Sequence, residues 1–238
     1  METLTPKQRE IREREAKILS IARPIVLREG YHGLNMDRIA EAVNYSKGTI
    51  YNHFSCKEEI IIALAAQTAQ KRVDLFRRAA EFKGKPRFRM MAIGEAAEIF
   101  ARDYPDYFMF EEIVQLPSVR EKTSEKRQAV IQGCELQCMS IVAGVARDGI
   151  SSGDLELPDG MTPEGLVYGL WALTSGAYGI MLKSESLPQF GLTDPLDLVR
   201  QHTSAMLDGY QWKPLSGSFD RIEILKTIRD EVFVSFGN

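Results

Sequence analysis

Five polar side chains lie within one short segment of this chain, at spacings that suit hydrogen bonding to nucleic acid. They are Lys47, Thr49, Tyr51, Asn52 and His53. A lysine can donate to guanine acceptors or to phosphate, and an asparagine can bond to the edge of adenine. A tyrosine hydroxyl can bond to a phosphate while its ring packs on the protein. The segment therefore predicts a surface that reads duplex DNA.

Two short helices joined by a tight turn are expected to position these side chains. Asn35 can cap the first helix, and Asn44 tolerates the left-handed backbone of a turn better than most residues. Ser46 can cap a second helix over residues 47–54, which has an apolar back. Lys57 opens the next helix, where charge and backbone amides suit a phosphate. Asn35, Ser46 and Lys57 therefore join the predicted DNA contacts.

The segment resembles the N-terminal DNA-binding domain of the tetracycline-repressor (TetR) family of bacterial regulators. The family pattern is a Gly-aromatic turn, a helix with Ile-Ala, a second helix with Ser-x-Gly-x-aliphatic-Tyr-x-His-Phe, and then Lys with acidic residues. In this chain the pattern is carried by Gly30-Tyr31, Ile39-Ala40, Ser46, Gly48, Ile50, Tyr51, His53, Phe54 and Lys57-Glu58-Glu59. Asn44 replaces the usual turn glycine and Tyr45 replaces a small aliphatic residue, but asparagine can adopt the turn geometry.

The resemblance implies an all-α fold with an N-terminal three-helix helix-turn-helix domain and a larger C-terminal helical domain for ligand binding and dimerisation. The expected domains are residues 1–56 for DNA binding, 57–214 for effector binding and dimerisation, and 215–238 for an additional C-terminal helix. It also implies a transcriptional regulator without enzymatic activity, a repressor that a small ligand releases from a near-palindromic operator. The alternative is a DNA-binding protein of the same fold that a protein partner or thiol oxidation controls.

Aromatic residues in the middle helices are the expected wall of the effector pocket. Their low polarity favours an apolar or aromatic, uncharged ligand, because a buried charge needs an opposite partner. Arg102 and Glu111 are expected to face solvent. The predicted ligand-binding residues are Phe100, Tyr104, Phe108, Phe110, Cys138, Trp171 and Tyr178.

The composition indicates an ordinary soluble globular protein. The 238 residues are 44% hydrophobic and 26% charged, with a formal net charge of -3. Three cysteines and no secretory leader favour the reducing cytoplasm. Cys134 and Cys138 are expected to share a helix face. The interpretations are a redox pair, half of a metal site and, the favoured one, two small buried apolar residues. The sequence indicates no cofactor and no metal site.

The segment Gly165–Leu182 is uncharged for 18 residues, close to the length that can span a bilayer. It contains four glycines and lacks a basic flank, so burial in a protein is favoured over membrane insertion. We expect one face of this helix to pack on its own subunit and the other on a partner, with the helices 162–183 and 195–212 forming a homodimer.

The remaining helices are expected from apolar periodicity and from proline and glycine breaks. Pro24 is expected to bend the first helix locally. The expected ranges are 7–29, 57–81, 87–103, 106–116, 118–148 and 219–236.

Overall fold

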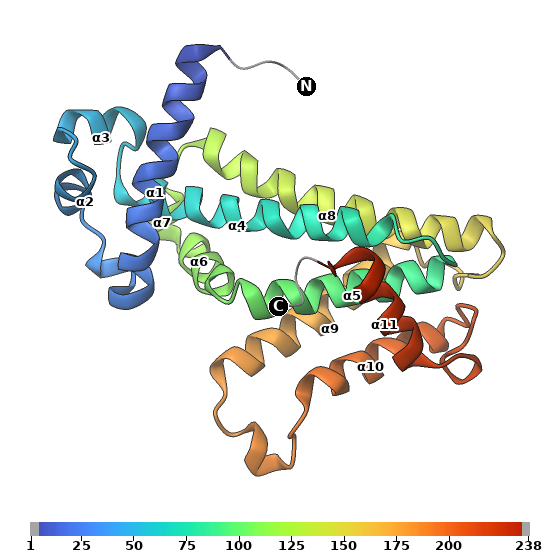
Figure 1. Cartoon of the computed structure of the whole chain (residues 1–238). Coiled ribbons are helices and arrows are strands. Elements are labelled where there is room, and N and C mark those ends of the chain that lie inside the picture. The colour runs from blue at the N-terminus through green and yellow to red at the C-terminus, as the bar shows by residue number, and fades with distance from the viewer. Residues whose placement is uncertain (1–4, 235–238) are drawn as a thin grey trace. The chain divides into compact units, whose positions relative to one another are not determined.

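The computed structural model of the chain describes residues 5–234, and that part contains helices and turns but no strand (Figure 1). Its main helices are α1 (Pro6–Gly33), α2 (Met36–Val43), α3 (Lys47–His53), α4 (Lys57–Ala80), α5 (Pro86–Asp103), α6 (Asp106–Gln115), α7 (Pro117–Arg120), α8 (Glu125–Ser151), α9 (Pro163–Lys183), α10 (Pro195–Gly209) and α11 (Arg221–Val232). The predicted all-α fold class is therefore confirmed. The predicted end of the last helix, Phe236, lies outside the described residues.

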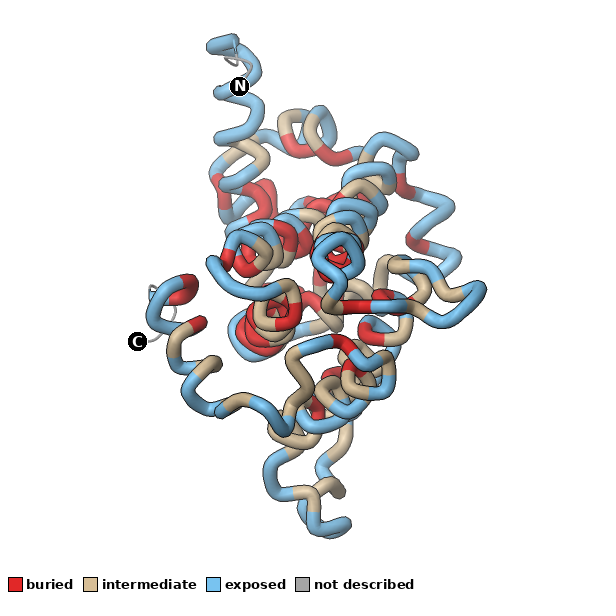
Figure 2. The backbone as a smooth tube through the Cα atoms, turned by 90° about the vertical axis from the view of Figure 1, so that its right-hand side faces the viewer, coloured by how far each residue is buried: buried red, intermediate tan, exposed pale blue. Residues whose placement is uncertain are grey.

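The helices divide into two compact units. Unit 1 comprises the chain up to Ala69 together with Asp106–Gly133, and unit 2 comprises Gln70–Pro105 and the residues from Cys134 on. Buried residues lie on the sides of the helices that face other helices (Figure 2). The predicted functional domains 1–56, 57–214 and 215–238 stay a prediction, and the compact unit around the first three helices reaches beyond residue 56.

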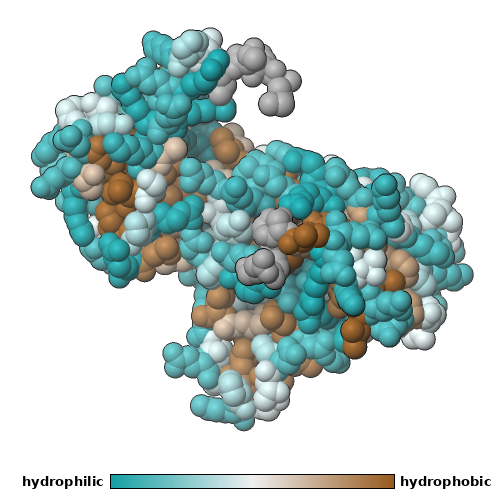
Figure 3. Space-filling view, in the orientation of Figure 1, coloured by the Kyte–Doolittle hydropathy of each residue, from teal (hydrophilic) through white to brown (hydrophobic). Residues whose placement is uncertain are grey.

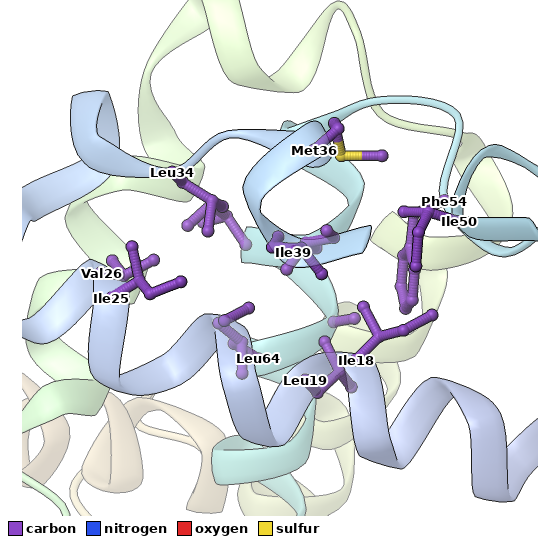
Figure 4. Close-up of a cluster of buried hydrophobic side chains, with 14 of the residues drawn as sticks. Ile18, Leu19, Ile25, Val26, Leu34, Met36, Ile39, Ile50, Phe54 and Leu64 are labelled. Carbon is purple, nitrogen blue, oxygen red and sulfur yellow. The ribbon is translucent and has the colours of Figure 1, made fainter. Parts of the chain in front are cut away.

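The core of unit 1 explains why it extends that far. Ile18 and Val26 of α1, Ile39 of α2, Ile50 of α3 and Leu64 of α4 are almost completely buried in one cluster (Figure 4). Phe110 of α6 is buried in the same cluster. Burial of apolar side chains stabilises a fold by about 1.5–3 kcal/mol for each large residue, so α4 and α6 contribute to this core together with α1 to α3.

The first helix is interrupted at Gly30, directly after its expected end at residue 29. Pro24 lies inside α1, and the non-helical dihedral angles occur at Gly30 instead, with a φ of 70°. A left-handed φ is easily adopted only by glycine, so Gly30 provides the turn that leads into Tyr31 and the next helix. The local bend expected at Pro24 stays a prediction.

The long helix expected over residues 118–148 is wrong, because α7 and α8 are separate. Thr123 is buried, and its hydroxyl donates to the carbonyl of Arg120. The backbone N–H of Ser124 donates to a Glu59 carboxylate oxygen at 3.3 Å. The Thr123 bond is a local side-chain hydrogen bond, which competes with helical ones, and the Ser124 bond to α4 takes a backbone N–H from the helix. The second part, α8, continues to Ser151, three residues beyond the expected end.

Unit 2 is built on α5, whose N-terminal turn holds a buried arginine. Arg87 is 1% exposed and donates to Asp208 at 2.8 Å and to the carbonyl of Trp212 at 3.0 Å. Trp212 is itself completely buried, against Gly149 of α8. The chain after α10 is therefore fixed to α5 and α8 before α11 begins.

Candidate DNA interface

The helix α3 is short, capped and amphipathic, as the sequence predicted. The Ser46 Oγ accepts from the backbone N–H of Thr49 at 3.0 Å. Ile50 and Phe54 are completely buried, whereas Lys47, Tyr51 and Asn52 are exposed. An isolated seven-residue helix is marginal in water, so its packing and its cap must hold it in place. Its polar side is consequently left available to a partner.

The turn before α3 also has the predicted geometry. The Asn35 Oδ1 accepts from the backbone N–H of Asp37 at 2.8 Å and caps α2. Asn44 ends α2 in the left-handed conformation, with a φ of 57°. The Asn35 Oδ1 accepts within the cap, and the side-chain NH2 group remains to donate to DNA.

Lys47 has an acidic neighbour on α2 that the sequence did not reveal. Its Nζ donates to the Asp37 Oδ2 at 2.6 Å, and both side chains are exposed. This hydrogen bond and the carboxylate charge raise the pKa of Lys47. A shallow depression beside this ion pair is lined by Asn35, Asp37, Arg38, Ala40, Glu41, Tyr45 and Lys47. Exposed ion pairs are weak, so Lys47 can exchange Asp37 for a DNA group.

His53 and Thr49 are less available than expected. The His53 side chain is only 9% exposed, and its Nδ1 lies 3.9 Å from a Glu15 carboxylate oxygen of α1. Thr49 is half-buried, with its hydroxyl 2.8 Å from the Ser46 Oγ. Lys47, Tyr51 and Asn52 are thus the predicted base and phosphate contacts that are fully exposed on α3.

Lys57 lies at the first position of α4 and contacts the turn after α1. Its Nζ lies 4.2 Å from the Tyr31 ring centroid. The Tyr31 hydroxyl donates to Glu58 at 2.5 Å, and burial together with this carboxylate raises the pKa of Tyr31 to about 12. The Gly30-Tyr31 and Lys57-Glu58-Glu59 parts of the sequence motif therefore meet in space and join α1 to α4.

The predicted effector residues lie in different surroundings. Phe110 is completely buried in unit 1, and Phe108 of the same helix is half-buried against Tyr107. Phe100 stacks on Tyr104 in unit 2, with ring centroids 5.5 Å apart. Trp171 is 43% exposed on α9, while Tyr178 of that helix is buried. Cys138 is buried on α8.

Ionisable side chains surround Tyr178, contrary to the expectation that few lie there. Arg200 donates to Glu98 at 2.5 Å, and Arg229 donates to Glu95 at 2.6 Å. Glu95 and Glu98 are buried, and burial raises the pKa of Glu98. Burial, with a further contribution from the Glu98 charge, also raises the pKa of Tyr178. The three-residue spacing of the two glutamates placed them on one helix face, but nothing in the sequence indicated their partners.

Burial also affects the two cysteines of α8. Cys134 and Cys138 are both buried, and burial raises the pKa of each thiol. A thiolate is the reactive form, so these thiols are poorly prepared for oxidation.

The face of α9 that the chain leaves open is apolar. Tyr168, Trp171, Ala172, Gly176 and Ile180 are exposed at helical spacing, whereas Leu166, Val167, Leu170 and Tyr178 are buried. Trp171 therefore lies on the open face of the helix and Tyr178 on the buried one. In a single chain 22% of the most apolar stretch of this helix is buried, and the expected burial of its other face against a partner stays a prediction. In the space-filling view, hydrophobic areas (brown) interrupt the hydrophilic surface (teal) (Figure 3).

Two helices, α8 and α9, are long and apolar enough to cross a membrane by length and composition, which is weak evidence for insertion. The core helix of a soluble protein passes the same test.

Comparison with known proteins identifies the N-terminal segment. The family model of bacterial regulatory proteins of the tetR family matches residues 18–64. The HTH-type transcriptional repressor AcnR of Corynebacterium diphtheriae is 36% identical over 66 residues, which are 28% of this chain and 35% of that protein. The HTH-type transcriptional activator FasR of Mycolicibacterium smegmatis is 33% identical over 84 residues, 35% of this chain and 38% of that protein. The chain thus matches little more than a third of the length of these relatives.

Solved structures extend the similarity to the fold of the remaining helices. A transcriptional regulator of the TetR/AcrR family from Thermobifida fusca superimposes with a TM-score of 0.60 at 21% identity, over 83% of this chain and 98% of that one. SmeT, the repressor of the Stenotrophomonas maltophilia multidrug efflux pump SmeDEF, gives a TM-score of 0.59 at 16% identity, over 84% of this chain and 92% of its own. Residues 18–64, which include the motif of α2 to α4, thus match the TetR family of bacterial regulatory proteins, and the remaining helices have the fold of these solved structures.

Proposed function

We propose that the protein is a sequence-specific DNA-binding regulator of transcription whose helix α3 enters the major groove. The observation that carries this proposal is the surface of α3, where Lys47, Tyr51 and Asn52 are exposed above a completely buried Ile50. A helix of this width fits the major groove, and lysine and asparagine match the acceptors and donors of base edges there.

Lys57 and Tyr51 are the proposed phosphate contacts beside the reading helix. Lys57 lies at the N-terminus of α4, where the helix dipole also favours an anion. His53, with its nearly buried side chain, holds α3 against α1 in this proposal rather than reading a base.

The proposed functional unit is a homodimer that covers the open face of α9. Tyr168 is 63% exposed and packs edge-to-face on Trp171, an arrangement that suits an interface better than open water. The glycine at position 176 meets no other atom within 4 Å where a Cβ would be, so a partner helix can approach closely. Two reading helices in such a dimer must lie about 34–36 Å apart on a near-palindromic operator.

The test of DNA binding is selection of a duplex from a random-sequence pool by the wild-type protein, followed by fluorescence anisotropy. Asn52→Ala should weaken binding of the selected duplex by about 1–3 kcal/mol, the value of one bidentate base contact. The control Gln132→Ala removes an exposed amide from α8 and should leave the affinity unchanged. Enrichment of no duplex by the wild type would overturn the proposed function.

We also propose that a small ligand controls DNA binding by the protein, and that the protein acts as a repressor in the cytoplasm. The stacked Phe100 and Tyr104 and the buried Tyr178 support an aromatic ligand. The ion pairs of Glu98 and Arg200 beside Tyr178 change the expected chemistry, because a ligand there meets hydrogen-bonding groups. We therefore expect an aromatic ligand with at least one polar group, not a purely apolar one.

Thermal-shift screening of the wild type tests this expectation. Aromatic compounds with a polar group should raise the melting temperature and weaken binding of the selected duplex, since binding free energies of two ligands are reciprocally coupled. Stabilisation only by purely apolar compounds would contradict the revised ligand chemistry. Of the alternatives, control by thiol oxidation is disfavoured by the burial of Cys134 and Cys138, and control by a protein partner would leave every compound without effect on DNA binding.

A further inference from the structure

The C-terminal end of α3 is held by one side chain from a distant part of the chain. Arg127, in the first turn of α8, donates from Nη2 to the backbone carbonyl of His53 at 2.9 Å. The last carbonyls of a helix have no partner within the helix, and a cation there also complements the helix dipole. Arg127 therefore completes the end of α3 that Ser46 does not reach.

The same guanidinium contacts two other helices of unit 1. Its Nη2 also donates to Glu15 of α1 at 3.1 Å, and its Nε lies 3.6 Å from a Glu59 carboxylate oxygen of α4. Its central carbon lies 4.4 Å from the centroid of the completely buried Phe54 ring. The Arg127 side chain, which is 22% exposed, thus contacts α1, α3 and α4.

Of the two carboxylate partners, Glu59 is itself held in place. Glu59 is 8% exposed and accepts from the backbone N–H groups of Ser55 at 3.2 Å and Ser124 at 3.3 Å. Burial opposes ionisation of Glu59, but these hydrogen bonds and the Arg127 charge outweigh it and lower its pKa. The ion pair therefore persists at neutral pH, and its geometry is fixed at both ends.

We infer that Arg127 is a positioning residue for DNA recognition, which fixes α3 relative to α1 and α4 without touching DNA. The inference rests on the proposed function of α3. A recognition site must be held to within about 0.5 Å and 10–20° by its supporting residues. The planar fork of arginine can bond several acceptors at once, which the single ammonium of lysine cannot do in the same geometry.

The experiment compares Arg127→Met and Arg127→Lys with the wild type, using the duplex that the wild type selects and a shuffled duplex of the same composition. Arg127→Met should weaken binding of the selected duplex tenfold or more and of the shuffled duplex much less, because contacts to the phosphate backbone do not depend on sequence. The slope of affinity against salt concentration should stay unchanged. Arg127→Lys, which keeps the charge, should recover only part of the affinity.

The matched control is Lys126→Met, which removes the same charge from the adjacent, exposed position of α8. It should bind both duplexes as the wild type does. Circular dichroism identifies a temperature at which each variant is folded, and hydrogen exchange of the α3 amides should be faster in Arg127→Met than in Lys126→Met.

Four outcomes would overturn the inference. Two concern affinity: Arg127→Met binds the selected duplex within twofold of the wild type, or it loses equal affinity for both duplexes. The third is a salt slope reduced by about one unit, which marks a direct phosphate contact. The fourth is full recovery of the affinity in Arg127→Lys. Failure of the wild type to select any duplex is a separate result, which would overturn the proposed function instead.

Discussion

Gly176→Glu gives the most direct test of the proposed dimer, because it should slightly stabilise an isolated subunit but strongly destabilise the dimer. Gly176 is exposed on α9, and a Cβ built there meets no other atom within 4 Å. Glycine in an exposed helix interior is less favourable than a good helix former by about 0.8–1 kcal/mol. The glutamate should therefore leave an isolated subunit folded, and slightly more stable.

The dimer should respond in the opposite direction. A carboxylate buried without a partner costs several kcal/mol after relaxation, and we take about 3 kcal/mol for each. A two-fold interface contains the substituted position twice, so the cost is about 6 kcal/mol for the dimer. At about 1.4 kcal/mol for each factor of ten, the dissociation constant should rise by about four orders of magnitude.

Sedimentation velocity over a range of micromolar concentrations measures this change, with helix content followed by circular dichroism. The variant should sediment as a folded monomer that no longer binds the selected duplex. Gly133→Glu is the control, since its position on α8 also leaves space for a Cβ. A variant that sediments as a dimer like the wild type, or a wild type that is monomeric, would refute the proposed interface. Loss of the helical circular dichroism signal would instead show that a single subunit does not tolerate glutamate at position 176.

Three further predictions, the last with a control variant, test the DNA interface and the core. Lys57→Ala should weaken binding of all duplexes and reduce the salt slope by about one unit, because its contact is to phosphate; an unchanged slope in anisotropy titrations would assign Lys57 another role. Ser46→Ala should destabilise the cap of α3 by about 0.5–2 kcal/mol and accelerate hydrogen exchange there, and wild-type exchange rates would contradict the cap. Gly149→Ala should lower stability in urea by about 1–3 kcal/mol, because its Cβ would lie 2.9 Å from the Trp212 ring, whereas Gly144→Ala meets nothing and should not destabilise. Equal unfolding midpoints for the two alanine variants would contradict the packing at Trp212.

The sequence alone determined the α2–turn–α3 segment. Its signals are local: Asn35 and Ser46 cap helices that begin at the next residue, and Asn44 provides the left-handed turn between them. A side chain that bonds to backbone within three residues can be recognised without knowing the rest of the fold. The same is true of Thr162, which caps α9 by accepting from the backbone N–H of Gly165.

Only the tertiary structure decided which distant side chains complete these local elements. Arg127 follows His53 by 74 residues, and the mixed charges of the residues around it give no local sign of that contact. Glu95 and Glu98 of α5 are ion-paired with arginines of α11 and α10, which left the surroundings of Tyr178 more polar than its aromatic neighbours indicated. Periodicity shows that a helix has an apolar face, but the partner of a charged side chain is set by which segments meet when the core forms, and that information is not local.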